Sequence, residues 1–320
     1  MRAVRFHRHG SPDVLQVDEV AVPEPAAGQV LIEVEAIGAN AIDTVLRAGG
    51  SPWDRPLPGT LTGDVVGRIA KLGPDTPPGV AVGQRVAALS EDAFADFAVA
   101  DGAFLAPIPA DADAGEATMM SMTAPLALRL LEAGRIPAGG TVLIQSAAGT
   151  VGHLAVQLAR FFDPKTIIGT ASSAKRLDFI RELGAEAVDL TDPDWPAKVR
   201  EIAPDGVDTA LDAVGGTVFD QGFDLVKPLG TMVTYGAITT ELPMIPGLGL
   251  FGRSVTGVSM MGWRQARPDE ARADIAEVTR RWQSGDLRPV VHATYPLTDV
   301  VRIHETLDAR TNLGRLIATT

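Results

Sequence analysis

A short glycine-containing turn carries the clearest chemical signal in this sequence. It follows an apolar stretch, 141–146, and opens an amphipathic stretch, 150–162, so it joins a predicted strand to a predicted helix. Its spacing is that of G-x-G-x-x-G with alanine in the first position: Ala147, Ala148, Gly149, Thr150, Val151 and Gly152. In such a turn the glycines allow close approach of a pyrophosphate and tight helix–strand packing, and the helix N-terminus binds the anion. The turn predicts a dinucleotide site, and the alternative is an ordinary strand-to-helix turn.

The end of the next predicted strand, 166–170, indicates which nicotinamide cofactor would bind. An Asp or Glu about 20 residues after the fingerprint normally binds the ribose 2′-hydroxyl of NADH. This chain has hydroxyl and basic side chains there instead, namely Ser172, Ser173, Lys175 and Arg176. Charge-assisted hydrogen bonds to a 2′-phosphate contribute about 1.5 to 3 kcal/mol each, so we expect NADPH. The alternative is that both cations belong to a solvated helix start, although cations there oppose the helix dipole.

The elements that would position these residues alternate regularly from residue 141 onward. Apolar strands are separated by amphipathic helical patterns, and six strands are predicted, at 141–146, 166–170, 187–190, 207–212, 231–235 and 254–260. This series predicts an α/β fold with a doubly wound, six-stranded parallel Rossmann sheet. The first hundred or so residues contain short strands broken by Gly and Pro, which indicates a separate β-rich domain.

Composition excludes several classes of function. The formal net charge of −12 would repel a phosphate backbone, so we expect no nucleic-acid partner. The chain has no cysteine, and its five histidines show no helical ligand spacing, so we expect no metal site. The N-terminus lacks the apolar run of a signal peptide, and no segment approaches the roughly 18 to 20 apolar residues of a bilayer span. We therefore expect a cytoplasmic location and no membrane partner.

Several segments, taken in chain order, resemble a known group of enzymes. They are Met1–Val4 with Gly10–Leu15, Gly38–Asp43, Val82–Val86, Ala147–Gly152, Leu211–Gly216 and Gly314–Leu316. Together they resemble the zinc-free, zeta-crystallin-like quinone oxidoreductase branch of the medium-chain dehydrogenase/reductase superfamily, over nearly the whole chain. The resemblance implies a GroES-like catalytic domain from residues 1–122 and 263–320, a Rossmann domain from 123–262, a cleft that holds NADPH, and a homodimer.

The resemblance also implies roles for individual residues. Asn40 falls where the family has an Asn beside the nicotinamide and the substrate, and is the candidate catalytic residue. Tyr235 and Gly236 follow the strand whose loop lies along the nicotinamide, and Arg310 falls where some members have a further phosphate-binding Arg.

Three positions depart from the family pattern: Ser51, Pro125 and Leu190, the last of which replaces an aromatic that in some members lies by the adenine ribose. Ser51 stands where many members have a Tyr in the active-site loop. Pro125 takes a place where a Thr often contacts the cofactor, and whether Thr123 replaces it is open. The missing Tyr counts against an enoyl thioester reductase, which uses it as proton donor.

These residues together favour reduction of an acceptor that is already electron-poor. Without a metal to polarise a carbonyl, hydride transfer suits a quinone or the activated C=C bond of an enone or 2-alkenal. The Asn40 amide could stabilise the forming enolate, and the alternative is an Asn that only holds a turn. Two other functions stay open: an enoyl thioester reductase, and a non-catalytic protein that binds or senses NADPH.

Overall fold

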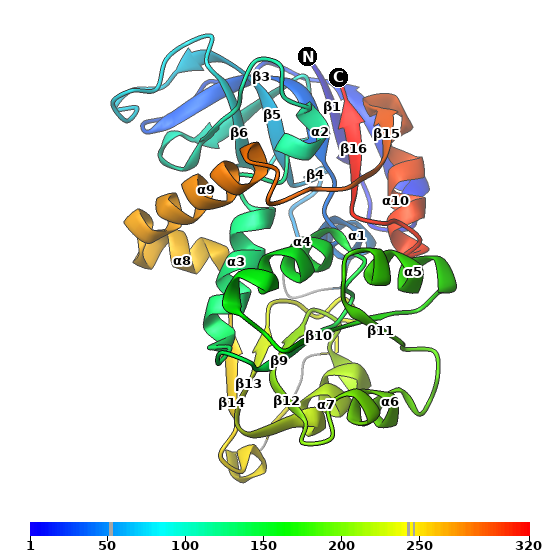
Figure 1. Ribbon diagram of the computed structural model, residues 1–320. Helices are drawn as coiled ribbons and strands as arrows, with labels where there is room; N and C mark the ends of the chain where they lie inside the picture. The colour runs from blue at the N-terminus through cyan, green and yellow to red at the C-terminus, as the bar shows by residue number, and fades with distance from the viewer. Residues whose placement is uncertain (51–53, 242–243, 246) are drawn as a thin grey trace. The chain divides into compact units, whose positions relative to one another are not determined.

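The chain divides into two compact units in the computed structural model, which describes residues 1–50, 54–241, 244–245 and 247–320 (Figure 1). Unit 1 comprises Met1–Pro125, Asp269–Ser284 and Pro289–Thr320, and unit 2 comprises Leu126–Pro268 and Gly285–Arg288. The domain limits expected from the sequence, near residues 122 and 262, stay a prediction.

Unit 2 contains a parallel sheet of six strands in the order β11-β10-β9-β12-β13-β14. The strands are β9 (Thr141–Ile144), β10 (Thr166–Ala171), β11 (Glu186–Asp189), β12 (Val207–Asp212), β13 (Val226–Thr234) and β14 (Ser254–Gly257). The chain builds outward from β9 to β11 and then crosses to β12 on the other side of β9. This reversal confirms the doubly wound α/β fold, and ligands of such sheets bind at the carboxyl ends of the strands beside the reversal.

Helices cover both faces of this sheet. Those after β9 and β10 lie on one face and those before and after β12 on the other (Figure 1). They are α4 (Thr150–Ala159), α5 (Ala174–Glu182), α6 (Trp195–Ile202) and α7 (Gly216–Leu225), with α3 (Thr123–Gly134) and α8 (Met260–Ala266) at the ends of the series. All six residues of β12 are buried, as expected for a central parallel strand covered on both sides.

Three predicted boundaries in unit 2 were wrong for local reasons. The first strand ends at Ile144, because Ser146 adopts a left-handed backbone with φ 53°. The helix expected over 150–162 is α-helical only to Ala159 and tightens into a 3₁₀ turn at Arg160–Phe162. The last strand ends at Gly257, since the Ser259 hydroxyl accepts a hydrogen bond from Gly262 N and starts α8.

Unit 1 contains a three-stranded sheet, β2-β1-β4, and a seven-stranded sheet whose path is β15-β16-β3-β5-β6-β8, with β7 paired to β3. The strands are β1 (Arg2–Phe6), β2 (Leu15–Glu19), β3 (Gln29–Gly38), β4 (Gly59–Thr60), β5 (Gly63–Leu72), β6 (Arg85–Ser90), β7 (Phe97–Asp101), β8 (Ala106–Pro107), β15 (Val291–Pro296) and β16 (Arg315–Thr319). The helices are α1 (Ile42–Ala48), α2 (Ala114–Ala117), α9 (Pro268–Gln283) and α10 (Val300–Asp308). Short 3₁₀ turns cover 12–14, 102–104 and 297–299 in this unit, and a further one covers 247–250 in unit 2.

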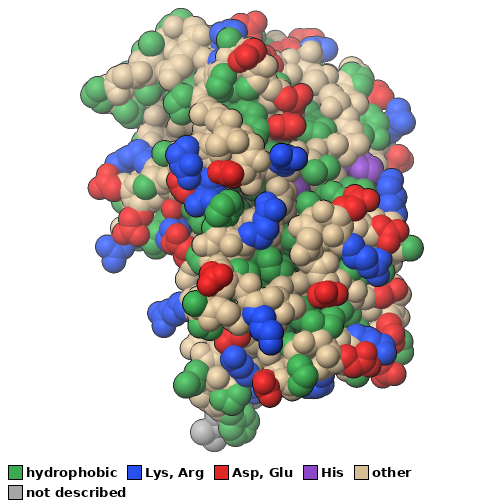
Figure 2. Space-filling view, viewed as in Figure 1, with side chains coloured by type: hydrophobic (Ala, Val, Ile, Leu, Met, Phe, Trp, Pro, Cys, Tyr) green, Lys and Arg blue, Asp and Glu red, His purple; other side chains and the backbone are tan. Residues whose placement is uncertain are grey.

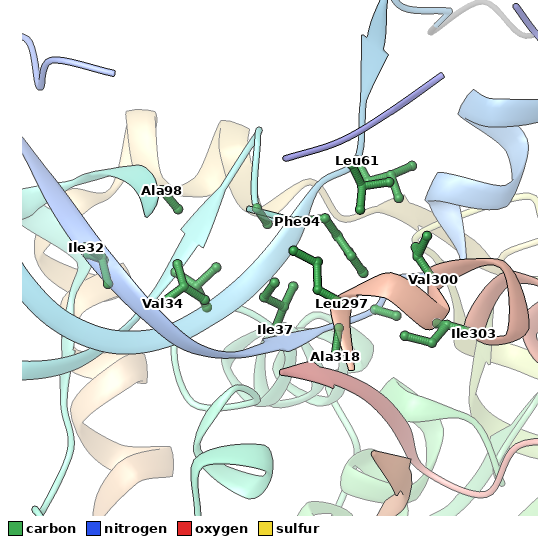
Figure 3. Packing of buried hydrophobic residues seen from close by; sticks show 14 of the residues in the cluster. Ile32, Val34, Ile37, Leu61, Phe94, Ala98, Leu297, Val300, Ile303 and Ala318 are labelled. Carbon is green, nitrogen blue, oxygen red and sulfur yellow. The ribbon is translucent and has the colours of Figure 1, made fainter. Parts of the chain in front are cut away.

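The C-terminal segment is part of the core of unit 1. Strand β16 pairs antiparallel with β3, so that Ile317 lies opposite Gly38. Figure 3 shows side chains of β3 and of α10 directed toward one another, together with those of Leu61 and Phe94. Burying one such aliphatic or aromatic side chain stabilises a fold by roughly 1.5 to 3 kcal/mol. The two ends of the chain are therefore joined by hydrophobic packing as well as by strand pairing.

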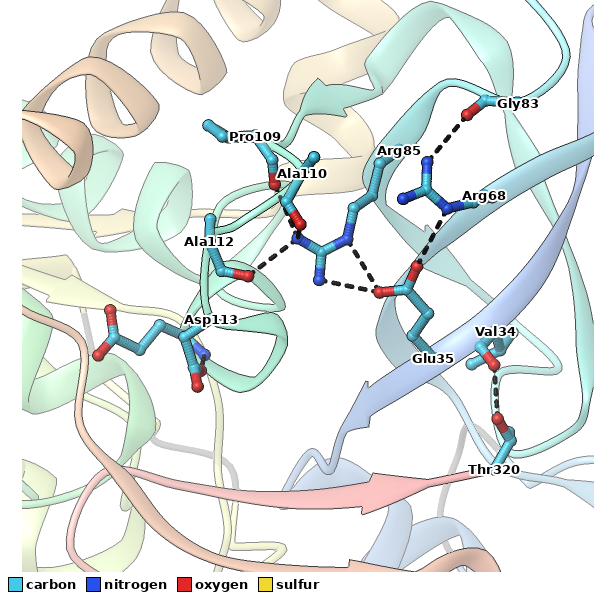
Figure 4. A network of polar contacts seen from close by, with 11 residues as sticks. Val34, Glu35, Arg68, Gly83, Arg85, Pro109, Ala110, Ala112, Asp113 and Thr320 are labelled. Atoms are coloured by element: carbon cyan, nitrogen blue, oxygen red, sulfur yellow. Dashed lines mark hydrogen bonds and ion pairs between the residues drawn. The ribbon is translucent and has the colours of Figure 1, made fainter.

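A polar network fixes the approach to α2 in unit 1 (Figure 4). The Arg85 guanidinium on β6 donates hydrogen bonds to the carbonyl oxygens of Pro109 (2.7 Å) and Ala112 (2.9 Å). It also pairs with Glu35, at 2.8 Å, and Glu35 in turn lies 3.8 Å from Arg68. Arg85 thus holds the loop before α2 through its backbone carbonyls.

The surface carries charges of both signs. On the face shown in Figure 2, Lys and Arg side chains are interspersed with Asp and Glu. None of the described helices is both long enough and apolar enough to cross a membrane.

Candidate active site

The fingerprint turn lies at the carboxyl end of β9, next to the reversal in strand order. Gly149 N donates to Ser146 O at 2.9 Å, and Ala147 N donates to Thr170 O on the neighbouring strand at 3.0 Å. Gly149 is the N-cap residue of α4, and no side chain caps this helix. The start of α4 thus has the arrangement in which a helix N-terminus binds an anion.

The two glycines of the turn differ in what surrounds them. A Cβ on Gly152 would lie 2.3 Å from Ser146 O and 2.7 Å from Ala147 Cα, so only glycine fits there. A Cβ on Gly149 would have just two neighbours within 4 Å, Ser146 O at 3.2 Å and Arg176 Nη2 at 4.0 Å. Gly152 therefore allows close packing of the helix on the turn, whereas Gly149 is less crowded, with one backbone oxygen and the end of one arginine side chain as its neighbours.

A further glycine explains why alanine fits the first fingerprint position. Ala147 is fully buried, and a Cβ on Gly169 of β10 would lie only 2.7 Å from the Ala147 Cβ. Gly169 thus makes room for the methyl group that a glycine at position 147 would lack. Sequence analysis missed this residue, although a glycine inside an apolar strand is itself a sign of close approach.

The hydroxyl and basic residues expected to bind a 2′-phosphate lie together at the end of β10. Ser172, Ser173 and Lys175 are exposed, and Ser173 is the N-cap of α5 without a side-chain capping bond. Arg176 is only 8% exposed, and its guanidinium reaches toward Gly149. Two hydroxyls, one exposed ammonium and one guanidinium therefore follow β10, and the guanidinium lies near the fingerprint turn.

The ends of β12 and β13 add a buried carboxylate to this edge of the sheet. Asp212 is fully buried and accepts hydrogen bonds from Val214 N (3.1 Å) and Gly215 N (3.2 Å). Burial raises the pKa of Asp212 to about 6. Tyr235 N donates to Asp212 O at 3.0 Å, and burial, then the Asp212 charge, raises the pKa of the Tyr235 phenol. Gly236 follows and is exposed.

Sequence analysis did not select Asp212 as a site residue. The signal was present, because Asp212 ends the strand that pairs with β9 and therefore flanks the fingerprint turn.

In unit 1, the candidate catalytic residue Asn40 lies between β3 and α1 and is half-buried. Its side-chain oxygen accepts a hydrogen bond from Arg315 Nη2 at 2.9 Å. The same nitrogen lies 2.6 Å from Asp64 Oδ2, and both partners of this ion pair are fully buried. No local sequence pattern indicates this pair, because its members are 251 residues apart.

The hydrogen bonds of Thr123 bear on whether it can replace the cofactor-contacting Thr that is absent at Pro125. The Thr123 hydroxyl donates to Asp64 Oδ2 (3.1 Å) and accepts from Arg315 Nη1 (2.5 Å). Its single hydrogen is therefore already used inside unit 1. Arg310 is exposed beyond the end of α10 in the same unit, and its phosphate-binding role stays a prediction. Ser51 lies outside the described residues.

No group of three or more His, Asp or Glu side chains that could hold a metal ion occurs in the described part of the chain.

Two family models match this chain. The model described as "Alcohol dehydrogenase GroES-like domain" matches residues 26–110, and the one described as "Zinc-binding dehydrogenase" matches residues 150–279. The first lies within unit 1, and most of the second lies within unit 2.

Similar proteins extend over nearly the whole chain. The mouse (Mus musculus) synaptic vesicle membrane protein VAT-1 homolog-like is 29% identical over 342 residues, which cover 99% of this chain and 81% of that protein. The human quinone oxidoreductase is 28% identical over 313 residues, which cover 96% of this chain and 94% of the relative. A mycobacterial protein solved in complex with NADPH has a TM-score of 0.92 and 29% identity, and the match covers all of both chains.

Proposed function

Because the chain belongs to the medium-chain dehydrogenase/reductase superfamily, in its branch of quinone oxidoreductases and VAT-1-like proteins, we propose that it is a zinc-independent, NADPH-dependent reductase of quinones or activated C=C bonds. The observation that carries this proposal is the uncapped start of α4 at Gly149, whose neighbours are Ser146 O and the Arg176 guanidinium. A dinucleotide pyrophosphate fits such a site, because its charge is stabilised by the helix N-terminus and its bulk needs a position without a side chain.

The residues proposed to hold the cofactor fall into three groups along the edge of the sheet in unit 2. The turn Ala147–Gly152 would bind the pyrophosphate. Ser172, Ser173, Lys175 and Arg176 would bind the 2′-phosphate. The family resemblance implies a phosphate-binding role for Arg310 as well. Tyr235 and Gly236 would lie along the nicotinamide. The absence of any acid among residues 170–176 favours NADPH over NADH, since a carboxylate there would repel the phosphate.

Bound NADPH supplies a hydride, which requires an electron-poor carbon in the acceptor. We propose that Asn40 donates a hydrogen bond to the acceptor oxygen and stabilises the negative charge that hydride addition places on it. A quinone or an α,β-unsaturated carbonyl becomes a hydroquinone or enolate anion in this step. Water then supplies the proton, so the reaction needs no dedicated acid.

The direct test is a screen of NADPH oxidation with quinones, 2-alkenals, enones and crotonyl-CoA, under air and under argon to detect redox cycling. The proposal expects turnover of a quinone or enone with a strong preference for NADPH. Equal catalytic efficiency with NADH would contradict the assignment of the 2′-phosphate site. Preferred turnover of crotonyl-CoA would favour an enoyl thioester reductase, and NADPH binding without any turnover would favour a sensor.

Two further expectations belong with this proposal. We propose that the protein acts in the cytoplasm and forms a homodimer, as the family resemblance implies. Size-exclusion chromatography with light scattering would test the dimer, and limited proteolysis would test domain limits near residues 122 and 262.

A further inference from the structure

The orientation of the Asn40 amide is fixed by its neighbour. Arg315 Nη2 lies 2.9 Å from Asn40 Oδ1, and a guanidinium can only donate hydrogen bonds. The amide oxygen must therefore face Arg315, and the amide nitrogen must point away from it. In the described part of the chain this is the only hydrogen bond of the Asn40 side chain, so both of its N–H groups remain for another acceptor.

Arg315 is itself held rigidly. Its guanidinium is fully buried, and Nη1 donates to Thr123 Oγ1 (2.5 Å). The two hydrogens of Nη2 are shared among Asn40 Oδ1, Gly38 O (2.9 Å) and Asp64 Oδ2 (2.6 Å). Ser121 completes the cluster by donating to Asp64 Oδ1 at 3.1 Å. Because a buried ion pair is costly to break and has few alternative geometries, the guanidinium presents Asn40 with a single arrangement.

A glycine makes room for this arrangement. A Cβ on Gly38 would lie 2.0 Å from Arg315 Nε and 2.4 Å from Arg315 Cζ. The guanidinium therefore lies directly over the backbone at the end of β3, two residues before Asn40. No larger residue at position 38 permits this packing.

We propose that Arg315 is a positioning residue that fixes Asn40 as a hydrogen-bond donor and so selects substrates whose reacting oxygen is an acceptor, the carbonyl of a quinone or enone. This inference rests on the proposed function and deepens it. An N–H donor binds a carbonyl oxygen more strongly as that oxygen gains negative charge, whereas the opposite amide orientation would set oxygen against oxygen. The cluster thus determines which end of the amide faces the substrate.

The sequence makes the orientation directly measurable. The chain contains only two asparagines, Asn40 and Asn312, so ¹⁵N-asparagine labelling gives two side-chain amide pairs in an NMR spectrum. Asn312 is a reporter of the local fold, because its Nδ2 donates to Gly314 O at 2.8 Å, one residue before Arg315. Substitution Asn40→Asp assigns the signals.

We expect Arg315→Lys, which keeps the charge beside Asp64 but not the planar fork, to shift or broaden the Asn40 pair and leave the Asn312 pair in place. Adding a naphthoquinone together with NADP⁺, a complex without a hydride to transfer, should move the Asn40 pair in the wild-type protein. An Asn40 pair that is identical in wild type and Arg315→Lys would overturn the proposal.

Kinetics supply the second test. Arg315→Lys should lower kcat at least tenfold with little change in the Kd for NADPH, and should lower it no further in an Asn40→Ala background, because both changes remove the same interaction. Asn40→Asp keeps an oxygen toward Arg315 but loses the donor, and should lower kcat about a hundredfold. Arg85→Lys is the matched control, since it disturbs another buried arginine of unit 1 that does not contact Asn40. If the effects of Arg315→Lys and Asn40→Ala on kcat were additive, Arg315 would have a general structural role and the inference would be wrong.

Failure of the proposed function would look different. If the wild-type protein reduced no acceptor, the reductase assignment would fall, while the comparison of Asn40 signals without ligand would still report whether Arg315 fixes the amide.

Discussion

Gly38 in unit 1 and Gly149 in unit 2 both leave space that a side chain would take, but the space is used differently. At Gly38 it is filled from within by the Arg315 guanidinium, 2.0 Å from an ideal Cβ. At Gly149 nothing comes closer than Ser146 O, at 3.2 Å. The same residue type therefore serves internal packing in one unit and ligand approach in the other, and only the neighbours distinguish the two uses.

The comparison predicts the largest loss of stability for Gly38→Ala. The added methyl group would displace a guanidinium that cannot move without leaving Asp64 unpaired, and breaking a buried pair costs about 3 to 5 kcal/mol. We expect urea denaturation to show a loss of about that size. Gly257→Ala is the control, since a Cβ there has no neighbour within 4 Å and should change stability little. A Gly38→Ala protein as stable as wild type would contradict the packing described here.

Within the fingerprint, Gly152→Ala and Gly149→Ala should separate stability from binding. Gly152→Ala forces a methyl group against Ser146 O and should cost about 1 to 3 kcal/mol of stability, as overpacking does. Gly149 has φ −80°, which any residue adopts, so Gly149→Ala should fold with only a small adjustment at Ser146 O, which lies 3.2 Å from the Cβ position. It should nevertheless raise the Kd for NADPH about tenfold or more in calorimetry, or roughly 1.4 kcal/mol. Unchanged NADPH affinity in Gly149→Ala would show that this space does not hold the pyrophosphate.

Arg176 extends the comparison, because its Nη2 lies 4.0 Å from the Cβ position of Gly149, whereas Arg315 occupies the Cβ position of Gly38. Arg176→Ala should reduce the preference for NADPH over NADH by about 10- to 100-fold, since a hydrogen bond to a charged group contributes about 1.5 to 3 kcal/mol. Lys175→Ala, at an exposed position, should reduce it by only about threefold. The ratio of kcat/KM for the two cofactors measures both, and an equal effect of the two substitutions would contradict the assignment.

Another buried arginine, Arg47, has a histidine as its partner, and the pKa of that histidine is lowered. Its Nη1 donates to His304 Nδ1 at 3.0 Å, and burial, with the Arg47 charge, lowers the pKa of His304 to about 3. In the unfolded chain that pKa is about 6.5, so below pH 6.5 the unfolded state binds more protons and stability falls as the pH falls. His304→Asn keeps an acceptor for Arg47 and should remove this loss, at most about 1.4 kcal/mol per pH unit.

Asp43 on α1 provides a control of opposite sign. Burial raises its pKa to about 7, so between pH 4 and 7 the folded state binds more protons and stability rises as the pH falls. Asp43→Asn should therefore lose stability relative to wild type on acidification, whereas His304→Asn gains it. Urea denaturation between pH 7.5 and 4.5 measures both trends. Parallel trends for the two variants would contradict these protonation states.

The Rossmann half of the protein could be predicted from the sequence. Its central strands β9, β10 and β12 are short apolar runs bounded by turn residues, and burial on both faces of a parallel sheet imposes that pattern locally. The fingerprint could be read for the same reason, because its glycines, the strand before it and the helix after it are contiguous in the chain. Predicted ends of elements were wrong where one side chain or one left-handed residue decided them, as at Ser146 and Ser259.

The surroundings of Asn40 depend on long-range strand pairing. Asp64 on β5 and Arg315 on β16 are brought together because both strands pair with β3, and no local pattern links residues 251 positions apart. Gly169 and Asp212 likewise lie beside the fingerprint turn only because their strands, β10 and β12, pair with β9. Hydrophobic periodicity is a local property that can be recognised in a short stretch of sequence. The partner of a buried charge depends instead on the fold, which brings the two groups together and excludes water from both.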